Sequence, residues 1–335
     1  MLRLAINGYG RIGRSVLRAL YESPMRGQVE VVAINEIADA RTVLHLSRYD
    51  STHGRFPGKV EGDGDSLLVD GHRIRLLSDP DIHHLPWSDL GVDMVLECSG
   101  AFSDRATAEQ HLQQGAGKVL FSQPAHADVD ATVIYGVNHQ DLRATDQIVS
   151  NASCTTNGII PVLNALQQHF GIDCAMITTI HSAMHDQPVI DAYDKDLRKT
   201  RSALQSIIPV ETGLAKGIER ILPELAGKVT AQAIRVPTIN VSMMDLTAKV
   251  EKSCSSEEVN NLLRSASLLN QGRVLGFSDE LLVSVDFNHD PSSSIIDANQ
   301  TQVCNQYMVK VVTWFDNEWG YANRMLDTAI AMMEA

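Results

Sequence analysis

The stretch Leu2-Arg3-Leu4-Ala5-Ile6-Asn7-Gly8-Tyr9-Gly10-Arg11-Ile12-Gly13 opens the chain and decides its fold. Residues 2–7 form an apolar run typical of a buried strand, and residues 14–21 repeat apolar side chains at helical spacing. A second apolar run, over residues 29–34, follows this helix and ends at Asn35 and Glu36. The pattern predicts a βαβ unit, which implies a parallel sheet and a right-handed crossover.

Three glycines lie between the first strand and its helix, and each has a separate physical task. Gly8 permits the tight turn, Gly10 lets the backbone approach a pyrophosphate, and Gly13 allows the helix to pack closely on the strand. A Gly-x-Gly-x-x-Gly sequence also occurs in purely structural βα turns. The prediction of a dinucleotide site therefore depends on the strand and helix around the loop, and on an acidic residue further along.

The rest of that site follows from the same unit. Arg11 and Ile12 lie where the start of the helix offers N–H groups to phosphate oxygens. Glu36 closes the second strand, where a carboxylate can accept hydrogen bonds from ribose hydroxyls and would repel a 2′-phosphate. The sequence thus predicts NAD as the cofactor in preference to NADP.

Further strands continue the first sheet, and longer ones follow residue 152. The expected strands are residues 74–77, 94–97, 118–121 and 132–135, then 175–180, 231–235 and 240–251. We expect an α/β protein in which residues 1–151 form a Rossmann-type, doubly wound parallel dinucleotide-binding domain. Residues 152–316 are expected to form an α+β catalytic domain with a mixed or antiparallel sheet. A helix within 317–335 is expected to fold back onto the first domain.

Composition limits the class of protein. The 335 residues carry a net charge of −13, which argues against general affinity for nucleic acid or anionic membranes. No apolar run is long enough to span a bilayer, and we expect a cytoplasmic protein without a signal peptide. The five cysteines are scattered, without a Cys-x-x-Cys pair or metal-ligand spacing, which favours free thiols and predicts no metal.

One cysteine lies in an unusual setting, Ser150-Asn151-Ala152-Ser153-Cys154-Thr155-Thr156-Asn157. A cysteine beside a helix start is more often a buried packing residue than a nucleophile. Three further segments accompany it: the glycine loop extended to Arg14, residues 235–238 (Arg-Val-Pro-Thr) and residues 314–321 (Trp-Phe-Asp-Asn-Glu-Trp-Gly-Tyr). Together, over essentially the whole chain, they resemble the phosphorylating glyceraldehyde-3-phosphate dehydrogenase family.

The resemblance implies a covalent aldehyde oxidation. In it Cys154 is the nucleophile, His181 is the base that assists it, and Asn317 orients the nicotinamide carboxamide. Cysteine suits this chemistry because attack on an aldehyde gives a hemithioacetal, from which hydride can leave to form a thioester. Neither His181 nor Asn317 can be nominated from spacing, since both lie far from Cys154 in the sequence. In isolation they are typical packing and turn residues.

The substrate is expected to be a small phosphorylated aldehyde. Arginine and other donors suit phosphate oxygens, and charge strengthens each hydrogen bond. The candidates are Ser153, Cys154, Thr155, Arg198, Lys199, Thr212, Gly213 and Arg235. Residues 198–201 (Arg-Lys-Thr-Arg) are also consistent with a solvated surface run, so which of these basic residues faces the phosphate stays open. The resemblance also implies a homotetramer.

Two departures from the family bear on the aldehyde. Met184 stands where a threonine hydroxyl usually contacts phosphate, and Gln123 replaces a small residue. Both match the branch that oxidises erythrose 4-phosphate to 4-phosphoerythronate, on the route to pyridoxal 5′-phosphate. The alternatives are a glyceraldehyde-3-phosphate dehydrogenase with a modified pocket and, more distantly, a non-catalytic NAD-binding regulator. Gly158 replaces a second cysteine common in the family, and we expect little effect.

Overall fold

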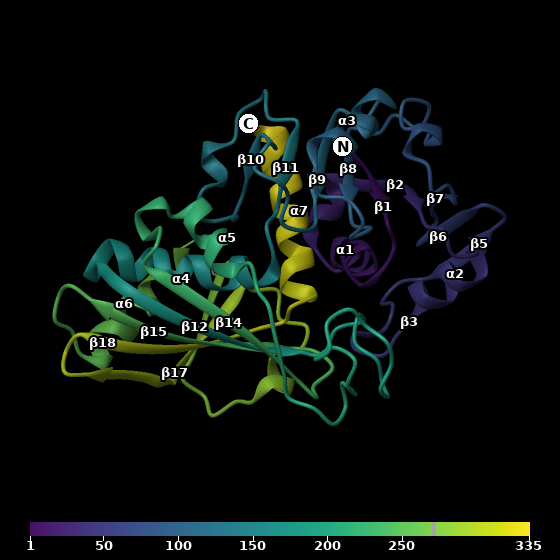
Figure 1. The fold of residues 1–335 in the computed structure, drawn as a ribbon. Coiled ribbons are helices and arrows are strands. Elements are labelled where there is room, and N and C mark those ends of the chain that lie inside the picture. Colours follow the sequence, from purple (N-terminus) through teal and green to yellow (C-terminus); the bar gives the residue numbers. More distant parts are fainter. Residues whose placement is uncertain (270–272) are drawn as a thin grey trace. The chain divides into compact units, whose positions relative to one another are not determined.

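The computed structural model describes residues 1–269 and 273–335, and these divide into two units (Figure 1). The first unit combines Met1–Ser153 with Tyr321–Ala335, and the second is Cys154–Gly320. The first unit is therefore discontinuous in sequence, because the whole of the second unit is inserted before its last helix.

The first unit is built on a nine-stranded sheet with the order β10-β11-β9-β8-β1-β2-β7-β6-β5. Its strands are β1 (Leu2–Asn7), β2 (Val29–Asn35), β5 (Val60–Asp63), β6 (Ser66–Val69), β7 (His72–Leu77), β8 (Met94–Glu97), β9 (Lys118–Phe121), β10 (Ala131–Thr132) and β11 (Ile148–Ser150). The strands from β10 to β7 pair in parallel, whereas β5 and β6 add antiparallel pairs at one edge. Two short strands, β3 (Tyr49–Asp50) and β4 (Gly54–Arg55), form a separate ladder.

The first unit's helices are α1 (Arg11–Tyr21), α2 (Ala40–Arg48), α3 (Arg105–Gln113) and most of α7 (Trp319–Glu334). α1 buries its face of Val16, Leu17 and Leu20, which accounts for the helical spacing in the sequence. β1 lies between β2 and β8, so the strand order reverses there. Ligands of open α/β sheets bind at the carboxyl ends of the strands at such a switch point.

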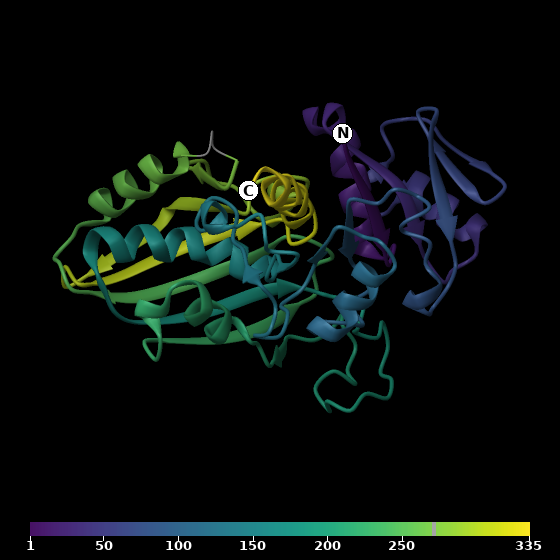
Figure 2. The ribbon, with the colours of Figure 1, turned by 90° about the horizontal axis from the view of Figure 1, so that it is seen from above.

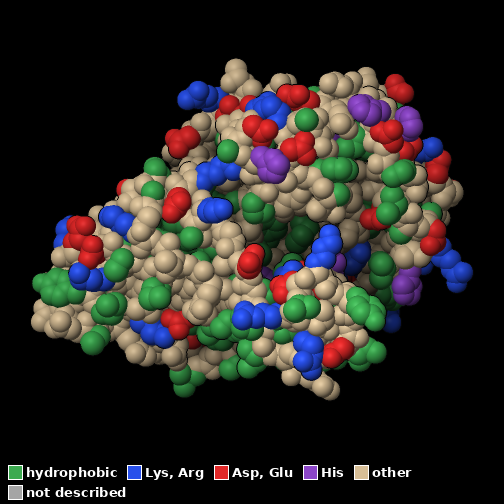
Figure 3. Space-filling model, in the orientation of Figure 1, with side chains coloured by type: hydrophobic (Ala, Val, Ile, Leu, Met, Phe, Trp, Pro, Cys, Tyr) green, Lys and Arg blue, Asp and Glu red, His purple; other side chains and the backbone are tan. Residues whose placement is uncertain are grey.

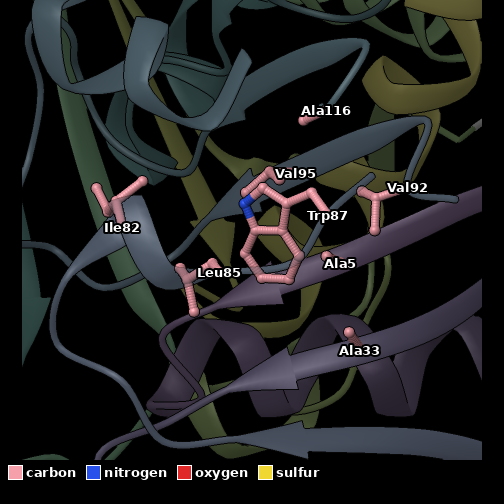
Figure 4. Packing of buried hydrophobic residues seen from close by; sticks show 8 residues of the cluster. All are labelled: Ala5, Ala33, Ile82, Leu85, Trp87, Val92, Val95 and Ala116. Carbon is pink, nitrogen blue, oxygen red and sulfur yellow. The ribbon is translucent and has the colours of Figure 1, made fainter. Parts of the chain in front are cut away.

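Trp87 lies at the centre of an apolar cluster beside β1 and β8 (Figure 4). Its indole is fully buried and is surrounded by Ala5, Ala33, Ile82, Leu85, Val92, Val95 and Ala116. The small alanines on β1 and β2 leave room for the large ring. Burial of such a ring is among the larger single contributions to a core.

One expected strand differs in the structure. Residues 132–135 were predicted to be extended, but β10 ends at Thr132. The side chain of Asn138 donates to the Thr132 carbonyl over 2.9 Å and accepts from Ile134 N–H over 2.7 Å. These bonds close a local turn and take two backbone groups that a longer strand would have offered to its neighbour.

The second unit contains a seven-stranded sheet with the order β13-β14-β12-β15-β18-β17-β16. Its strands are β12 (Ile172–Ser182), β13 (Ile208–Val210), β14 (Val229–Val236), β15 (Ser242–Val250), β16 (Leu275–Ser278), β17 (Ser294–Cys304) and β18 (Met308–Phe315). β12 pairs with β14, and β16 with β17, in parallel, while the other neighbours are antiparallel. The sheet is therefore mixed.

Three helices, α4 (Cys154–Phe170), α5 (Leu214–Ile221) and α6 (Ser256–Ser267), pack beside one another and on this sheet (Figures 1 and 2). α6 begins with a capping box, in which Ser255 and Glu258 satisfy each other's backbone N–H groups. The first sheet, which is parallel except at the edge formed by β5 and β6, and the mixed second sheet confirm the predicted fold class.

None of the helices in the described residues is long and apolar enough to cross a membrane. Figure 3 shows acidic and basic side chains interspersed over the visible face. On that face the excess of negative charge is not gathered into one acidic patch.

Candidate active site

At two glycines of the loop in the first unit, Gly8 and Gly13, a side chain would clash with neighbouring backbone atoms. Gly8 adopts φ +88°, and a Cβ there would lie 2.4 Å from Ser99 Cα. A Cβ on Gly13 would lie 2.4 Å from the Gly8 carbonyl oxygen, so this glycine sets the close approach of α1 to the loop. Around Gly10, by contrast, no atom lies within 4 Å of the position of a Cβ. That space leaves the backbone accessible where a pyrophosphate would approach.

The groups around the loop fit a dinucleotide. Gly10 is the N-cap of α1 and no side chain caps this end, so the first-turn N–H groups of Arg11 and Ile12 suit phosphate oxygens. Glu36 Oε2 accepts from Tyr9 N–H over 2.8 Å, which fixes the carboxylate beside the loop. Its second oxygen accepts from Ala38 N–H over 3.2 Å.

The Arg11 side chain is committed elsewhere. Its guanidinium pairs with the carboxylate of Asp50. Although burial opposes it, hydrogen bonds from Arg11 and from the backbone hold the pKa of Asp50 well below its usual range. Arg11 can therefore serve a cofactor through its backbone, while its side chain ties α1 to Asp50.

A buried polar chain, which the sequence did not predict, crosses the ends of three strands. Asn35, Asn7 and Glu97 are register neighbours at the carboxyl ends of β2, β1 and β8. Asn35 Nδ2 donates to Asn7 Oδ1 over 2.8 Å, and Asn7 Nδ2 donates to Glu97 Oε2 over 2.6 Å. Glu97 is fully buried and also accepts from Ser99 N–H over 2.8 Å. This series of side-chain hydrogen bonds joins β2, β1 and β8 at the switch point.

His111 of α3 completes this chain from the far side. Trp87 Nε1 donates to His111 Nδ1 over 3.0 Å, which assigns the ring proton to Nε2. Nε2 lies 3.2 Å from Glu97 Oε2 and can donate to it. The donors around Glu97 explain how a carboxylate is accommodated without solvent. The only sequence signal was a polar residue at the end of each apolar strand.

Cys154 is the first residue of α4. Its sulfur lies 3.9 Å from Nε2 of His181, near the end of β12, so the structure brings these two predicted residues together. Burial raises the pKa of the Cys154 thiol to about 12, and the carboxylates of Glu318 and Asp316 add to this rise. Backbone N–H groups at the start of α4 act in the opposite direction.

The imidazole of His181 is oriented by its other nitrogen. Nδ1 lies 2.8 Å from the carbonyl oxygen of Ser182, which makes Nδ1 the protonated atom and leaves Nε2 as an acceptor facing the sulfur. Burial lowers the pKa of His181, and the positive charge of Arg235 lowers it further. A neutral imidazole directed at a neutral thiol is an arrangement suited to proton transfer.

Asn317 is held by two hydroxyl groups. Ser182 Oγ and Ser242 Oγ each donate to Asn317 Oδ1 over 3.0 Å. Ser242 Oγ in turn accepts from Ser182 N–H over 3.1 Å, so its proton is directed at the amide. Because Oδ1 receives both hydroxyls, the amide orientation is fixed with Nδ2 turned away from them.

The phosphate-binding candidates occupy different settings. Ser153 and Thr155 flank Cys154, and Thr212 Oγ1 accepts from Leu214 N–H over 3.2 Å just before α5, with Gly213 as its N-cap. Arg198 is exposed. Lys199 and Arg235 are brought together by a residue that the sequence reasoning missed, Asp186. Its carboxylate accepts from Lys199 Nζ over 3.1 Å and from Arg235 Nη1 over 2.7 Å.

The two substrate-determining candidates lie in different units. Met184 is 40% exposed, and its N–H donates to Gln187 Oε1 over 3.0 Å. In the first unit, the Gln123 amide donates to the Phe102 carbonyl. Among the described residues no group of three histidine, cysteine or acidic side chains is placed to hold a metal ion.

Two protein-family models match the chain. Residues 2–105 match the NAD-binding domain of glyceraldehyde 3-phosphate dehydrogenase. Residues 153–317 match the C-terminal domain of the same enzyme. The first match confirms the prediction that NAD is the cofactor.

Proposed function

Because the chain belongs to the glyceraldehyde-3-phosphate dehydrogenase family, we propose that it oxidises erythrose 4-phosphate to 4-phosphoerythronate. The family itself establishes an NAD-dependent oxidoreductase that acts on an aldehyde phosphate. The contact of 3.9 Å between Cys154 Sγ and His181 Nε2 carries the proposed chemistry. A nucleophile with a base in reach is what an aldehyde needs before it can release hydride.

The reaction begins with Cys154. As the sulfur bonds to the aldehyde carbon, its proton passes by way of the unprotonated Nε2 of His181 to the carbonyl oxygen, which becomes the hydroxyl of a hemithioacetal. The resulting hemithioacetal loses its hydroxyl proton to the same nitrogen, and the carbon becomes able to release hydride. Loss of hydride leaves a thioester on Cys154, which a nucleophile then cleaves.

NAD, when bound, supplies the acceptor for that hydride. Gly8, Gly10 and Gly13, with the N–H groups of Arg11 and Ile12, would hold its pyrophosphate. Glu36 would accept from the ribose hydroxyls. Asn317 would donate from Nδ2 to the carboxamide oxygen, since Oδ1 is already occupied by two hydroxyl groups.

The choice of aldehyde is supported by two departures from the family, Met184 and Gln123. A methionine has no hydrogen-bond donor to offer a phosphate, and here it is partly exposed. Erythrose 4-phosphate carries its phosphate one carbon further from the aldehyde than glyceraldehyde 3-phosphate does, so a different arrangement of donors suits it. The proposed partners of the substrate phosphate are Lys199, Arg235, Thr212 and Gly213. Further candidates are Ser153, Thr155 and Arg198.

The deciding experiment measures NAD reduction with each aldehyde phosphate, with and without inorganic phosphate. We expect faster turnover of erythrose 4-phosphate. Faster turnover of glyceraldehyde 3-phosphate would instead identify a glyceraldehyde-3-phosphate dehydrogenase with an altered pocket. If the protein binds NAD but reduces it with neither substrate, a non-catalytic regulator would be favoured. The Cys154→Ala variant, which lacks only the sulfur, serves as the control for covalent catalysis.

We also propose that the protein is a cytoplasmic homotetramer. All five cysteines are free thiols, as in proteins of a reducing compartment. The segment after β12, residues 184–207, runs as a loop (Figure 2) and carries exposed apolar side chains that support assembly. Six of its large apolar side chains are more than half exposed, namely Val189, Ile190, Tyr193, Leu197, Leu204 and Ile207. Exposed apolar groups gathered in this way favour a protein–protein contact.

A further inference from the structure

Two candidate phosphate-binding cations of the second unit share a single carboxylate. Asp186 Oδ1 lies 2.7 Å from Arg235 Nη1, and Asp186 Oδ2 lies 3.1 Å from Lys199 Nζ. The Arg235 side chain is only 10% exposed, and that of Lys199 is 27% exposed. Each oxygen of the carboxylate is thus bonded to a different cation, as two oxygens of a phosphate would be.

The carboxylate is held in its charged form. Burial opposes ionisation, but hydrogen bonds and charge from Arg235 and Lys199 outweigh it and hold the pKa of Asp186 below its usual value. A phosphate that approached the same two cations would meet this negative charge directly. Like charges brought together in a partly buried site repel each other strongly, which weakens the binding of the free anion.

The pair lies beside the base that serves Cys154. Arg235 on β14 is the register partner of His181 on β12. The charges of Arg235 and Asp186 both act on the imidazole, with opposite effects on its pKa. A free phosphate bound to Arg235 would therefore stand close to the groups that handle the thioester.

We propose that Asp186 is a specificity-determining residue: as a built-in anion it occupies Arg235 and Lys199, keeps free inorganic phosphate away from them, and leaves water to cleave the thioester. The inference rests on the proposed function, because it concerns the second half of that reaction. It applies to free phosphate. A phosphate carried by the substrate is held near the site by the rest of the molecule, so its effective concentration is far higher.

The two outcomes differ in the atom that attacks. With water, the oxygen bonds to the thioester carbon, the carbon–sulfur bond breaks, and the sulfur leaves as the Cys154 thiolate. One water proton passes to His181 Nε2, which has returned its first proton to solvent, and the carboxylic acid formed loses the other. With phosphate, a phosphate oxygen bonds to the same carbon and an acyl phosphate is released. No electrons are transferred in either case.

The test is the Asp186→Asn variant, which keeps the shape of the side chain and removes its charge. Initial rates and products are measured against inorganic phosphate, with whichever aldehyde phosphate the unmodified enzyme turns over. Acyl phosphate is distinguished from carboxylate by trapping with hydroxylamine. In the unmodified enzyme we expect rate and product to be independent of phosphate. In Asp186→Asn the share of acyl phosphate should rise by about tenfold or more, because the repulsion is removed.

Two controls accompany it. Asp186→Glu retains the charge and should remain insensitive to phosphate. Asp191→Asn removes an exposed carboxylate of the same segment, one that pairs with Arg201, and should also leave the product unchanged. Thermal unfolding with and without inorganic phosphate measures binding independently of turnover, and only Asp186→Asn should gain stability from phosphate.

Two results would overturn the inference. One is an Asp186→Asn protein that still forms only carboxylate and gains no stability from phosphate. The other is an unmodified enzyme that already forms acyl phosphate efficiently. Failure of the proposed function is recognised separately, as an unmodified enzyme that prefers glyceraldehyde 3-phosphate or that reduces no NAD with either aldehyde.

Discussion

The protein favours the neutral forms of both Cys154 and His181, relative to the same side chains free in water. The thiol has its pKa raised to about 12, and that of the imidazole is lowered, so a thiolate–imidazolium pair is disfavoured in the protein alone. In the proposed mechanism the nucleophile is therefore a neutral thiol, which loses its proton as it attacks. This arrangement differs from cysteine sites in which a stable ion pair keeps the sulfur reactive.

Alkylation of Cys154 in the cofactor-free protein tests that description. Below the pKa of a thiol, the thiolate fraction grows by about tenfold for each pH unit. We therefore expect the rate of modification by iodoacetamide to be low at neutral pH and to keep rising beyond pH 9. Cys174 and Cys304 are exposed and will also react, so the modified peptide must be followed by mass spectrometry. A rate that is high and constant around neutral pH would contradict the raised pKa.

The two hydroxyls on Asn317 predict a change in cofactor discrimination. In the Ser182→Ala/Ser242→Ala variant the amide is free to turn, and each lost hydrogen bond is worth about 1 kcal/mol. A turned amide presents Oδ1, which can still accept from the carboxamide NH₂ of NAD. It cannot bond to an analogue whose acetyl group has only an acceptor. The loss in kcat/KM should therefore be greater with the 3-acetylpyridine analogue than with NAD.

Ser265→Ala is the matched control, because Ser265 is an exposed serine whose hydroxyl donates to the Asn261 carbonyl within α6. It should leave both cofactors unaffected. If kcat/KM of the double variant falls by the same factor with both cofactors, the two hydroxyls contribute only to stability and do not determine the orientation of the Asn317 amide.

At the scale of elements, α4 fits its sheet through Gly158, a position where the family often has cysteine. A Cβ on Gly158 would lie 2.4 Å from Met244 Cε, and Met244 on β15 is fully buried. From the sequence we expected that the absence of a cysteine at position 158 has little effect on the reaction. The structure adds a packing reason for glycine, since the methionine fills the space that a side chain would need.

This contact predicts coupling between the two residues. Gly158→Ala gains about 1 kcal/mol of helix propensity but must displace the methionine. Met244→Ala opens a cavity and costs about 2–5 kcal/mol. The double variant should be more stable than the sum of the two single changes by about 1 kcal/mol, measured by urea unfolding. Gly217→Ala, whose Cβ would meet Thr156 instead, should combine additively with Met244→Ala.

Elements that are determined by residues close together in the sequence could be predicted, whereas features that depend on distant contacts could not. The βαβ unit is encoded by apolar runs and three glycines, and its strands and helix form where these residues predict them. The expected strand at 132–135 is cut short by the Asn138 side chain, which no strand propensity reveals. The contact of Asp186 with Arg235 joins residues 49 positions apart, and that of Glu97 with Asn7 joins residues 90 apart. Such contacts follow only from the register of the sheets.

At the scale of the whole molecule, the exposed segment 184–207 predicts the assembly state. Replacing Tyr193 and Leu197 by aspartate places charge where an apolar contact is proposed, so the particle should contain fewer than four chains. Light scattering after size exclusion measures the mass directly. Leu281→Asp, which changes another exposed leucine outside the segment, is the control. An unmodified protein that is monomeric, or an unaltered mass in the variant, would contradict the proposal.

The first unit has one further property, which concerns how the protein is made. Tyr321 on α7 donates its hydroxyl to the Ala152 carbonyl over 2.9 Å, and Thr328 Oγ1 donates to Asn151 Oδ1 over 2.8 Å. Ala152 has φ +55°, a conformation that costs a non-glycine residue about 1–3 kcal/mol and therefore needs such support.

During synthesis this support comes late, because the ribosome makes the chain from its N-terminus and Tyr321 lies 169 residues after Ala152. While residues 154–320 emerge, the backbone two positions before Cys154 still lacks the hydroxyl that will hold it. The backbone before Cys154 thus gains this hydrogen bond only after Tyr321 has been translated. A chain released before Tyr321 therefore contains Cys154 without the hydroxyl that supports the backbone of Ala152.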